Sequence, residues 1–230
     1  GVLGMTPTYS RVSRNGLIDY GNSLDKIGVI TKNIYENALA LEIISGYDAN
    51  DLTSSKEKVP SYEKEMQIKK KMTIGIPKEL LENKAVDAKV KDAFCEKIEE
   101  FKKKGFEIKN ISMPLTEKYG ISCYYLIALT ESSTNLAKYC GLRYGLTKKI
   151  DANENCKEFF SEIREQGFGK EAKRRILLGT FARMAGFRDA YYLKAMKTRT
   201  LIIDEFKKAF SQVDLIANPS DSFTILLRTS

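Results

Sequence analysis

Two short apolar segments flank an amphipathic helix in this sequence, and that arrangement leaves the chain few possible folds. Apolar residues alternate over 72–77, and the run ends at a proline, which cannot continue a central strand. Over 85–104 apolar side chains recur every three or four residues, opposite a mostly charged face. Gly105 ends this helix, and 106–111 form a second strand before Pro114. Strands joined in this way run parallel with a right-handed crossover, which predicts an α/β fold.

The rest of the chain is predicted to be mostly helical. Apolar residues follow helical spacing over 31–45, 115–139 and 170–210. Residues 213–217 are predicted to add a further buried strand. By contrast, 48–71 are rich in Asp, Asn, Ser, Lys and Glu, which indicates an exposed connection. A length of 230 residues leaves room for one or two domains.

The sequence contains no histidine. Ser-His-Asp hydrolases, papain-like thiol enzymes and two-histidine metal sites all need an imidazole, so this chain alone supports none of them. If the chain takes part in hydrolysis, the base must be Lys, Asp or Glu, or must come from residues outside it. The net charge of +8 is compatible with an acidic partner. However, the basic residues are spread along the chain, which favours solvated faces over a nucleic-acid patch.

The cysteines indicate free thiols. Cys95, Cys123, Cys140 and Cys156 are widely spaced, form no CxxC pair and have no histidine to complete a zinc site. We therefore expect no bound metal and a reduced, cytoplasmic protein. The apolar runs are too short to span a bilayer, so no membrane association is expected.

One segment partly matches a calcium loop. Asp151, Asn153, Asn155 and Glu162 fall at positions 1, 3, 5 and 12 of that pattern. The sixth position is Cys156, where the loop needs a residue that tolerates positive φ, normally glycine. We therefore favour Asn155 as the N-cap of a helix over a calcium ligand.

Two pairs of side chains have both a structural and a functional interpretation. Arg174 and Arg175 lie early in a predicted helix, where such a pair is usually solvated or paired with acids. An arginine can also grip a carboxylate through two parallel hydrogen bonds. Tyr124 and Tyr125 adjoin an apolar run, so the residues alone favour core aromatics with a hydrated hydroxyl.

Four stretches of the sequence match one family. They are GVLGMTPTYSRVSRNGLIDYGNSLDKIG at 1–28, IGIPKE at 74–79, YYLIALTESSTNLAKYCGLRYG at 124–145 and EAKRRILLGTFARMAGFRDAYYLKAMKTRTLI at 171–202. The first closely resembles the segment that follows the catalytic serine in the amidase signature family. Within that family, the last two are similar to the A subunits of glutamyl-tRNA(Gln) amidotransferases. The resemblance covers nearly the whole chain.

The resemblance implies a broad mixed β-sheet sandwiched between helices, of which residues 1–230 form a single, partial amidase domain. It also implies a Ser, cis-Ser and Lys triad that works without histidine. In the family this triad lies upstream of the segment matched at Gly1, so we expect no catalytic residue here and no activity from this chain alone. The chain also begins without Met and ends inside an apolar run, which predicts that it is a piece of a longer protein.

The resemblance further implies two glutamine contacts, Tyr124 and Arg175, and a third, an Asp in a family segment beyond Ser230. The implied function is the glutaminase subunit of the amidotransferase, which supplies ammonia for converting Glu-tRNA(Gln) to Gln-tRNA(Gln). Its partners would be the B and C subunits, with ATP and Mg²⁺ at the B subunit, no cofactor on this chain, and tRNA bound mainly through the partner. Two alternatives stay open: a stand-alone amidase, and a non-catalytic scaffold that has lost the serine half.

Three residues depart from the family pattern in the first matched stretch. Thr6 replaces the usual Lys, Ser10 replaces Gly and Asn15 replaces Tyr. Glycine is the residue that tolerates positive φ, so the backbone at Ser10 is a point to examine.

Overall fold

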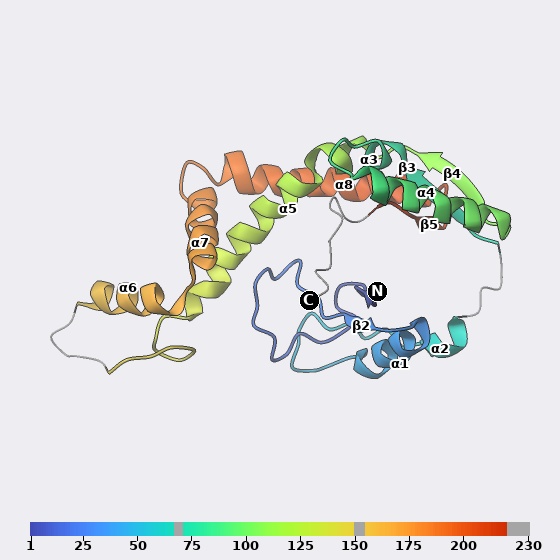
Figure 1. Ribbon diagram of the computed structural model, residues 1–230. Coiled ribbons are helices and arrows are strands. Elements are labelled where there is room, and N and C mark those ends of the chain that lie inside the picture. The colour runs from blue at the N-terminus through green and yellow to red at the C-terminus, as the bar shows by residue number, and fades with distance from the viewer. Residues whose placement is uncertain (67–70, 150–154, 220–230) are drawn as a thin grey trace, which may run out of the picture. The chain divides into compact units, whose positions relative to one another are not determined.

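The computed structural model describes residues 1–66, 71–149 and 155–219, and the chain divides into two compact units (Figure 1). The first unit takes the chain up to residue 67 and again over 125–193. The second takes 68–124 and the chain from 194 onward.

The second unit contains a three-stranded parallel sheet. Its strands are β3 (Thr73–Pro77), β4 (Glu107–Ile111) and β5 (Leu215–Ile216), in the order β4-β3-β5. The central strand β3 is buried from Ile74 to Pro77. A short helix, α3 (Lys78–Leu81), follows it. The predicted strand at 72–77, the second strand and their parallel pairing are thus confirmed, as is the α/β class.

Helix α4 (Ala88–Lys103) joins β3 to β4, as the periodicity predicts (Figure 1). It begins at Asp87, whose carboxylate accepts the Lys89 backbone N–H at 2.8 Å. It ends before Gly105, whose φ of +89° is the left-handed conformation that closes many helices. On its apolar face Ile98 is buried.

The core of the second unit lies where the sheet meets helix α8 (Lys194–Phe210). Ile111, Met113, Ala209 and Val213 are buried together there. The α8 side chain Glu205 accepts the backbone N–H groups of Leu115 and Thr116, at 2.9 and 2.8 Å. These N–H groups open helix α5 (Pro114–Asn135), where the helix dipole favours an anion. The predicted helices over 115–139 and 194–210 are therefore confirmed and joined at this point.

The last strand differs from its prediction. We expected a buried strand over 213–217, but β5 has two residues, of which Leu215 is 45% exposed. Only Val213, just before the strand, is buried. The reason is position: in the described sheet β5 pairs with β3 on one side only, so its outer edge has no covering strand.

The first unit opens with an antiparallel pair, β1 (Leu3–Met5) and β2 (Val29–Thr31), followed by helix α1 (Ile34–Ile44). The predicted helix over 31–45 is confirmed, but it starts three residues later because Thr31 belongs to β2. On α1 the buried amide of Asn37 donates to the carbonyls of Leu3 and Val29, at 3.3 and 3.4 Å. These bonds satisfy a buried polar group and fasten the helix to the strands.

The connection predicted over 48–71 is less exposed than expected. Asp51 and Ser54 are buried, and the Asp51 carboxylate accepts the Arg14 backbone N–H at 2.9 Å. Its neighbours at 57 and 58 offer their carbonyls to the Arg11 guanidinium, just before helix α2 (Tyr62–Glu65). Hydrophilic composition therefore reflects hydrogen bonding to the first matched stretch as well as solvent exposure.

Two further helices complete the first unit: α6 (Cys156–Gly167) and α7 (Lys170–Arg183), with the short helices η1 (Leu136–Lys138) and η2 (Asp189–Leu193). Asn155 caps α6 by accepting the Lys157 N–H at 2.9 Å, so the predicted N-cap is confirmed. Asp151 and Asn153 of the partial calcium pattern lie outside the described residues.

Helices α5 and α7 approach each other closely at Gly179. A Cβ atom at this glycine would lie 1.8 Å from the carbonyl oxygen of Leu129 and 2.9 Å from Cβ of Ser133. One turn further along α7, Arg183 donates to the Ser133 hydroxyl at 3.1 Å. The absent side chain at Gly179 therefore sets the distance between the two helices.

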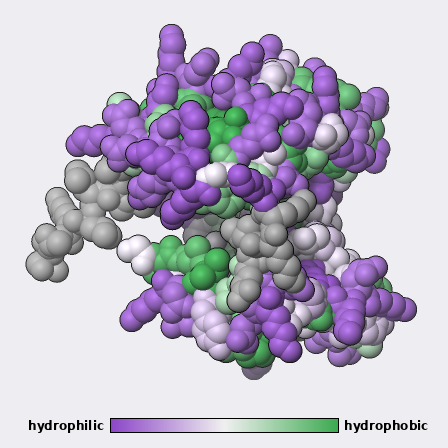
Figure 2. Space-filling model, turned by 90° about the vertical axis from the view of Figure 1, so that its right-hand side faces the viewer, coloured by the Kyte–Doolittle hydropathy of each residue, from purple (hydrophilic) through white to green (hydrophobic). Residues whose placement is uncertain are grey.

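The surface is hydrophilic over most of the face in Figure 2, with hydrophobic side chains among the charged ones. Leu52, Ile43 and Leu177 are among the large apolar residues that are exposed. All four cysteines are free thiols, as predicted. In the part of the chain that the structure covers, none of the helices combines the length and apolar content that a membrane crossing needs.

A first prediction concerns Ser10, whose φ of +72° is a left-handed conformation that costs an L-residue about 1 kcal/mol or more relative to glycine. Ser10→Gly should therefore raise the free energy of unfolding by about 1 kcal/mol in denaturant titrations. The control Ser161→Gly, in exposed helix α6, should lower it by about 0.5 kcal/mol. A loss of stability in Ser10→Gly would contradict the backbone conformation.

A second prediction tests the contact between α5 and α7. Gly179→Ala should destabilise the chain by about 3 kcal/mol, because the added methyl overlaps the Leu129 carbonyl and the helices must separate. Gly120→Ala is the matched helical control: the nearest atom to its Cβ is 3.9 Å away, so it should stabilise by up to about 1 kcal/mol. Thermal unfolding of both variants distinguishes the two effects, and equal stabilisation would exclude the close approach.

Candidate functional site

Arg175 is held from two sides in the first unit. Its Nε donates to Glu171 Oε1 at 2.7 Å, one turn earlier on α7, and its Nη1 donates to the Tyr20 hydroxyl at 2.8 Å. The guanidinium also lies over the Tyr20 ring, 5.5 Å from the ring centre, which adds a cation–π attraction. The Arg175 side chain is 30% exposed, so it remains accessible to a ligand.

Tyr20 is itself fixed by hydrogen bonds on both sides of its backbone. Its N–H donates to Asp25 Oδ2 at 2.7 Å, and its carbonyl accepts the Asn135 amide at 3.0 Å. Next to it, Ser23 donates to Glu131 through its N–H and its hydroxyl, at 2.9 and 2.7 Å. Glu131 and Asn135 stand four residues apart on α5 and so share one face of it. Residues 19–25 are thus tied to α5, and Tyr20 reaches Arg175 from this fixed loop.

An ion pair extends the same attachment. Lys138 Nζ lies 2.9 Å from Asp19 Oδ2. The hydrogen bond to Lys138 is the largest cause that lowers the pKa of Asp19, and the same bond raises the pKa of Lys138. Both groups therefore stay charged at neutral pH.

Arg174 and Arg175 share one carboxylate. Arg174 binds Glu171 with both Nε and Nη2, at 2.8 and 2.7 Å, and Arg175 adds a third bond. The hydrogen bonds from Arg174 first, and from Arg175 next, lower the pKa of Glu171 to about 2. The bond to Glu171 raises the pKa of both arginines. Two cations and one anion leave a net positive charge beside Tyr20.

The geometry leaves part of the Arg175 guanidinium available. Within the described part of the chain, its Nη2 makes no hydrogen bond, while Nε and Nη1 are engaged. A guanidinium with a free edge binds a carboxylate through charge-assisted hydrogen bonds. Arg174 differs, since both atoms of its Nε and Nη2 fork already face Glu171 and its side chain is 54% exposed. Arg175 is therefore the better placed of the pair for binding an anionic ligand.

Tyr124 lies on α5 in the second unit, whereas Arg175 lies in the first, so each is described separately. Tyr124 is 48% exposed and its neighbour Tyr125 is 44% exposed. The interpretation of both as core aromatics is wrong. The reason is the helix face: Cys123 and Ile127 lie on the buried side of α5, and the two tyrosines lie off it.

Two residues of the site were missed by the sequence reading: Tyr20 and Glu171. Glu171 was recoverable, because an acid three and four residues before two arginines predicts helical ion pairs. Tyr20 lies 155 residues from Arg175, and no local pattern joins them.

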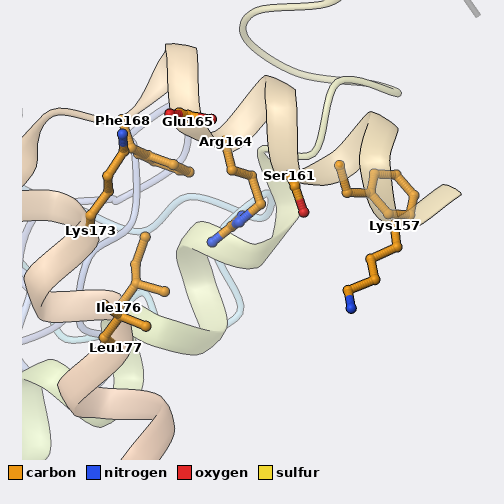
Figure 3. A pocket seen from close by; sticks show the side chains of 9 residues that line it. Lys157, Ser161, Arg164, Glu165, Phe168, Lys173, Ile176 and Leu177 are labelled. Atoms are coloured by element: carbon orange, nitrogen blue, oxygen red, sulfur yellow. The ribbon is translucent and has the colours of Figure 1, made fainter. Parts of the chain in front are cut away.

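A separate groove lies between α6 and α7, with a cavity volume of about 810 Å³. Figure 3 shows the side chains that border it. They are Lys157, Phe160, Ser161, Arg164 and Glu165 from α6, Phe168 from the connecting turn, and Lys173, Ile176 and Leu177 from α7. Arg164 is partly engaged there, since it lies 4.9 Å from the centre of the Phe168 ring. Arg175 does not line this groove, so the groove is distinct from the site at Tyr20.

Comparison with known proteins places the chain in a family. The Amidase family model matches residues 1–226. The chain is 45% identical over 221 residues to the A subunit of the glutamyl-tRNA(Gln) amidotransferase of Persephonella marina, covering 96% of this chain and 45% of that protein. The corresponding protein of Staphylococcus epidermidis is 46% identical, with the same coverage. A crystal structure of such an A subunit from Thermotoga maritima superposes with a TM-score of 0.67 at 30% identity, covering 100% of this chain and 45% of that one.

The chain therefore belongs to the amidase signature family, as the four matched stretches predict. It spans less than half the length of the relatives it matches.

A third prediction concerns the charge of Glu171. Its carboxyl should titrate with a pKa of about 2, because Arg174 and Arg175 bind the charged form. The stabilisation from these pairs is then fully present above the ordinary pKa of 4.5 and is lost as the pH falls through about 2. NMR of the side-chain carboxyl carbon measures this directly, and Arg174→Gln should return the pKa toward 4.5. Titration near the ordinary value in the unchanged chain would show that the pairs do not persist in solution.

Proposed function

We propose that this chain is the glutamine-binding part of the glutaminase subunit of a glutamyl-tRNA(Gln) amidotransferase. The observation that carries the proposal is the Arg175 site: a guanidinium held on two sides, with a free edge, on a stretch of sequence similar to these subunits. Free glutamine presents an α-carboxylate, which suits such an edge. Tyr124 supplies a second contact to glutamine through its hydroxyl.

In this proposal the chemistry itself needs residues outside the 230. The resemblance implies a serine that attacks the carboxamide, a second serine and a lysine that transfer the proton, and backbone N–H groups that stabilise the oxyanion. None of these belongs to the matched stretches. The chain by itself should therefore bind glutamine without hydrolysing it.

The proposed reaction places the remaining components on partners. Ammonia released from glutamine passes to the B subunit, which binds ATP and Mg²⁺ and amidates Glu-tRNA(Gln), while the C subunit binds the glutaminase subunit. No cofactor or metal is assigned to this chain. Contact with tRNA occurs mainly through the partner, because the basic residues here do not interleave with aromatic side chains in an RNA-binding motif. The four free thiols suit the reducing cytoplasm.

A stand-alone amidase is the second candidate of the same family. An amidase with a neutral substrate has no carboxylate for Arg175 to bind, so the free edge of this guanidinium favours an amino acid amide.

A fourth prediction tests Arg175 in the assembled amidotransferase. Arg175→Lys keeps the charge but loses the planar fork, and hydrogen bonds to charged groups are worth roughly 1.5 to 3 kcal/mol. Glutamine kcat/KM should therefore fall by about ten- to a hundredfold. Amidation driven by free ammonia should be unchanged, since it bypasses this site.

Arg174→Lys is the matched control, because Arg174 points about 100° around the helix from Arg175. It should change glutamine kcat/KM by less than about threefold. Equal losses in the two variants, or loss of ammonia-driven amidation, would show that the pair is structural.

A further inference from the structure

An arginine that selects a carboxylate must present its free edge in a fixed direction. The side chain is long and rotatable, so an unrestrained guanidinium loses conformational entropy when a ligand binds. Groups that hold it in advance remove part of that cost. The structure contains two such groups beside Arg175, and they differ in charge.

Glu171 restrains Arg175 but also weakens its attraction for an anion. It is negatively charged, and it lies on the same helix. Its Oε2 is occupied by Arg174, so Glu171 offers Arg175 a single hydrogen bond and not a fork. A second holder is therefore needed to fix the orientation of the guanidinium plane.

Tyr20 meets this requirement without neutralising the charge. Its phenol is neutral near pH 7, its hydroxyl accepts from Nη1 at 2.8 Å, and its ring lies beneath the guanidinium at 5.5 Å. Its backbone is fixed by Asp25 and Asn135. The ring and the hydroxyl together restrict the guanidinium in two directions.

We propose that Tyr20 is a positioning residue for substrate selection: it fixes the Arg175 guanidinium so that the free edge faces the α-carboxylate of the amide substrate. This inference rests on the proposed role of Arg175. Tyr20 acts through Arg175 and touches no reacting atom. It makes the site selective for an amide that carries a carboxylate over one that does not.

The test uses the assembled amidotransferase with two substitutions. Tyr20→Phe keeps the ring and loses the acceptor, whereas Tyr20→Leu loses both. Glutamine and glutaminamide, in which the α-carboxylate is replaced by a neutral amide, are compared as substrates in ammonia-release assays. We expect KM for glutamine to rise about threefold in Tyr20→Phe and about tenfold in Tyr20→Leu, with kcat nearly unchanged. Glutaminamide hydrolysis, which lacks the carboxylate contact, should not change.

Tyr9→Leu is the matched control. Tyr9 has the same arrangement elsewhere in the first unit: its ring lies 5.1 Å from the Arg14 guanidinium, and its hydroxyl bonds to the Asn22 carbonyl. Any general loosening of the loops should appear in this variant too. It should leave the ratio of glutamine to glutaminamide kcat/KM as in the unchanged enzyme.

A double substitution separates a role through Arg175 from an independent one. If Tyr20 acts through Arg175, Tyr20→Leu should add no more than about twofold to the loss in Arg175→Lys. Additive losses, or equal losses with glutamine and glutaminamide, would overturn the positioning role. If Arg175→Lys leaves glutamine KM unchanged, the proposed function fails with it. If Arg175→Lys raises KM but Tyr20→Leu does not, only the role of Tyr20 fails.

Discussion

The close approach of α5 and α7 at Gly179 is the contact on which the first unit depends. A glycine there removes the side chain that would strike the Leu129 carbonyl. Arg175 and Arg183 lie four residues before and after this glycine, so the same face of α7 carries all three. Arg183 bonds to Ser133 on α5, and Arg175 reaches Tyr20. One small residue thus determines where the guanidinium of the candidate site stands.

The loop over 19–25 makes the third side of this arrangement. Glu131 and Asn135 on α5 bind its backbone, and Lys138 binds Asp19. Most of these are hydrogen bonds to charged groups or to backbone, which are stronger and more directional than apolar contacts. Since the Ser23 and Tyr20 contacts fix main-chain atoms, the position of the Tyr20 ring follows from the fold and does not depend on a ligand.

The elements with a clear period were predictable from the sequence, and the site was predictable only in part. The alternation at 72–77 and the helical stripe of α4 each follow from local patterns. Arg175 was predicted from its matched stretch. By contrast, the burial of Asp51 and the pairing of Tyr20 with Arg175 depend on contacts between distant residues, on which local composition gives no information. The exposure of Leu215 likewise follows from the edge of a sheet, which a single strand does not reveal.

The charges around Arg175 explain why its two neighbours are of different kinds. A carboxylate alone would hold the guanidinium but would also repel an incoming carboxylate, and a second carboxylate would cancel the positive charge. Arg174 binds both oxygens of Glu171, which leaves the cluster positive overall. A neutral phenol then supplies orientation at no electrostatic cost. Lysine in place of Arg175 has no planar edge to orient, so neither neighbour would fix its direction in the same way. The arrangement therefore favours a planar cation that binds a planar anion.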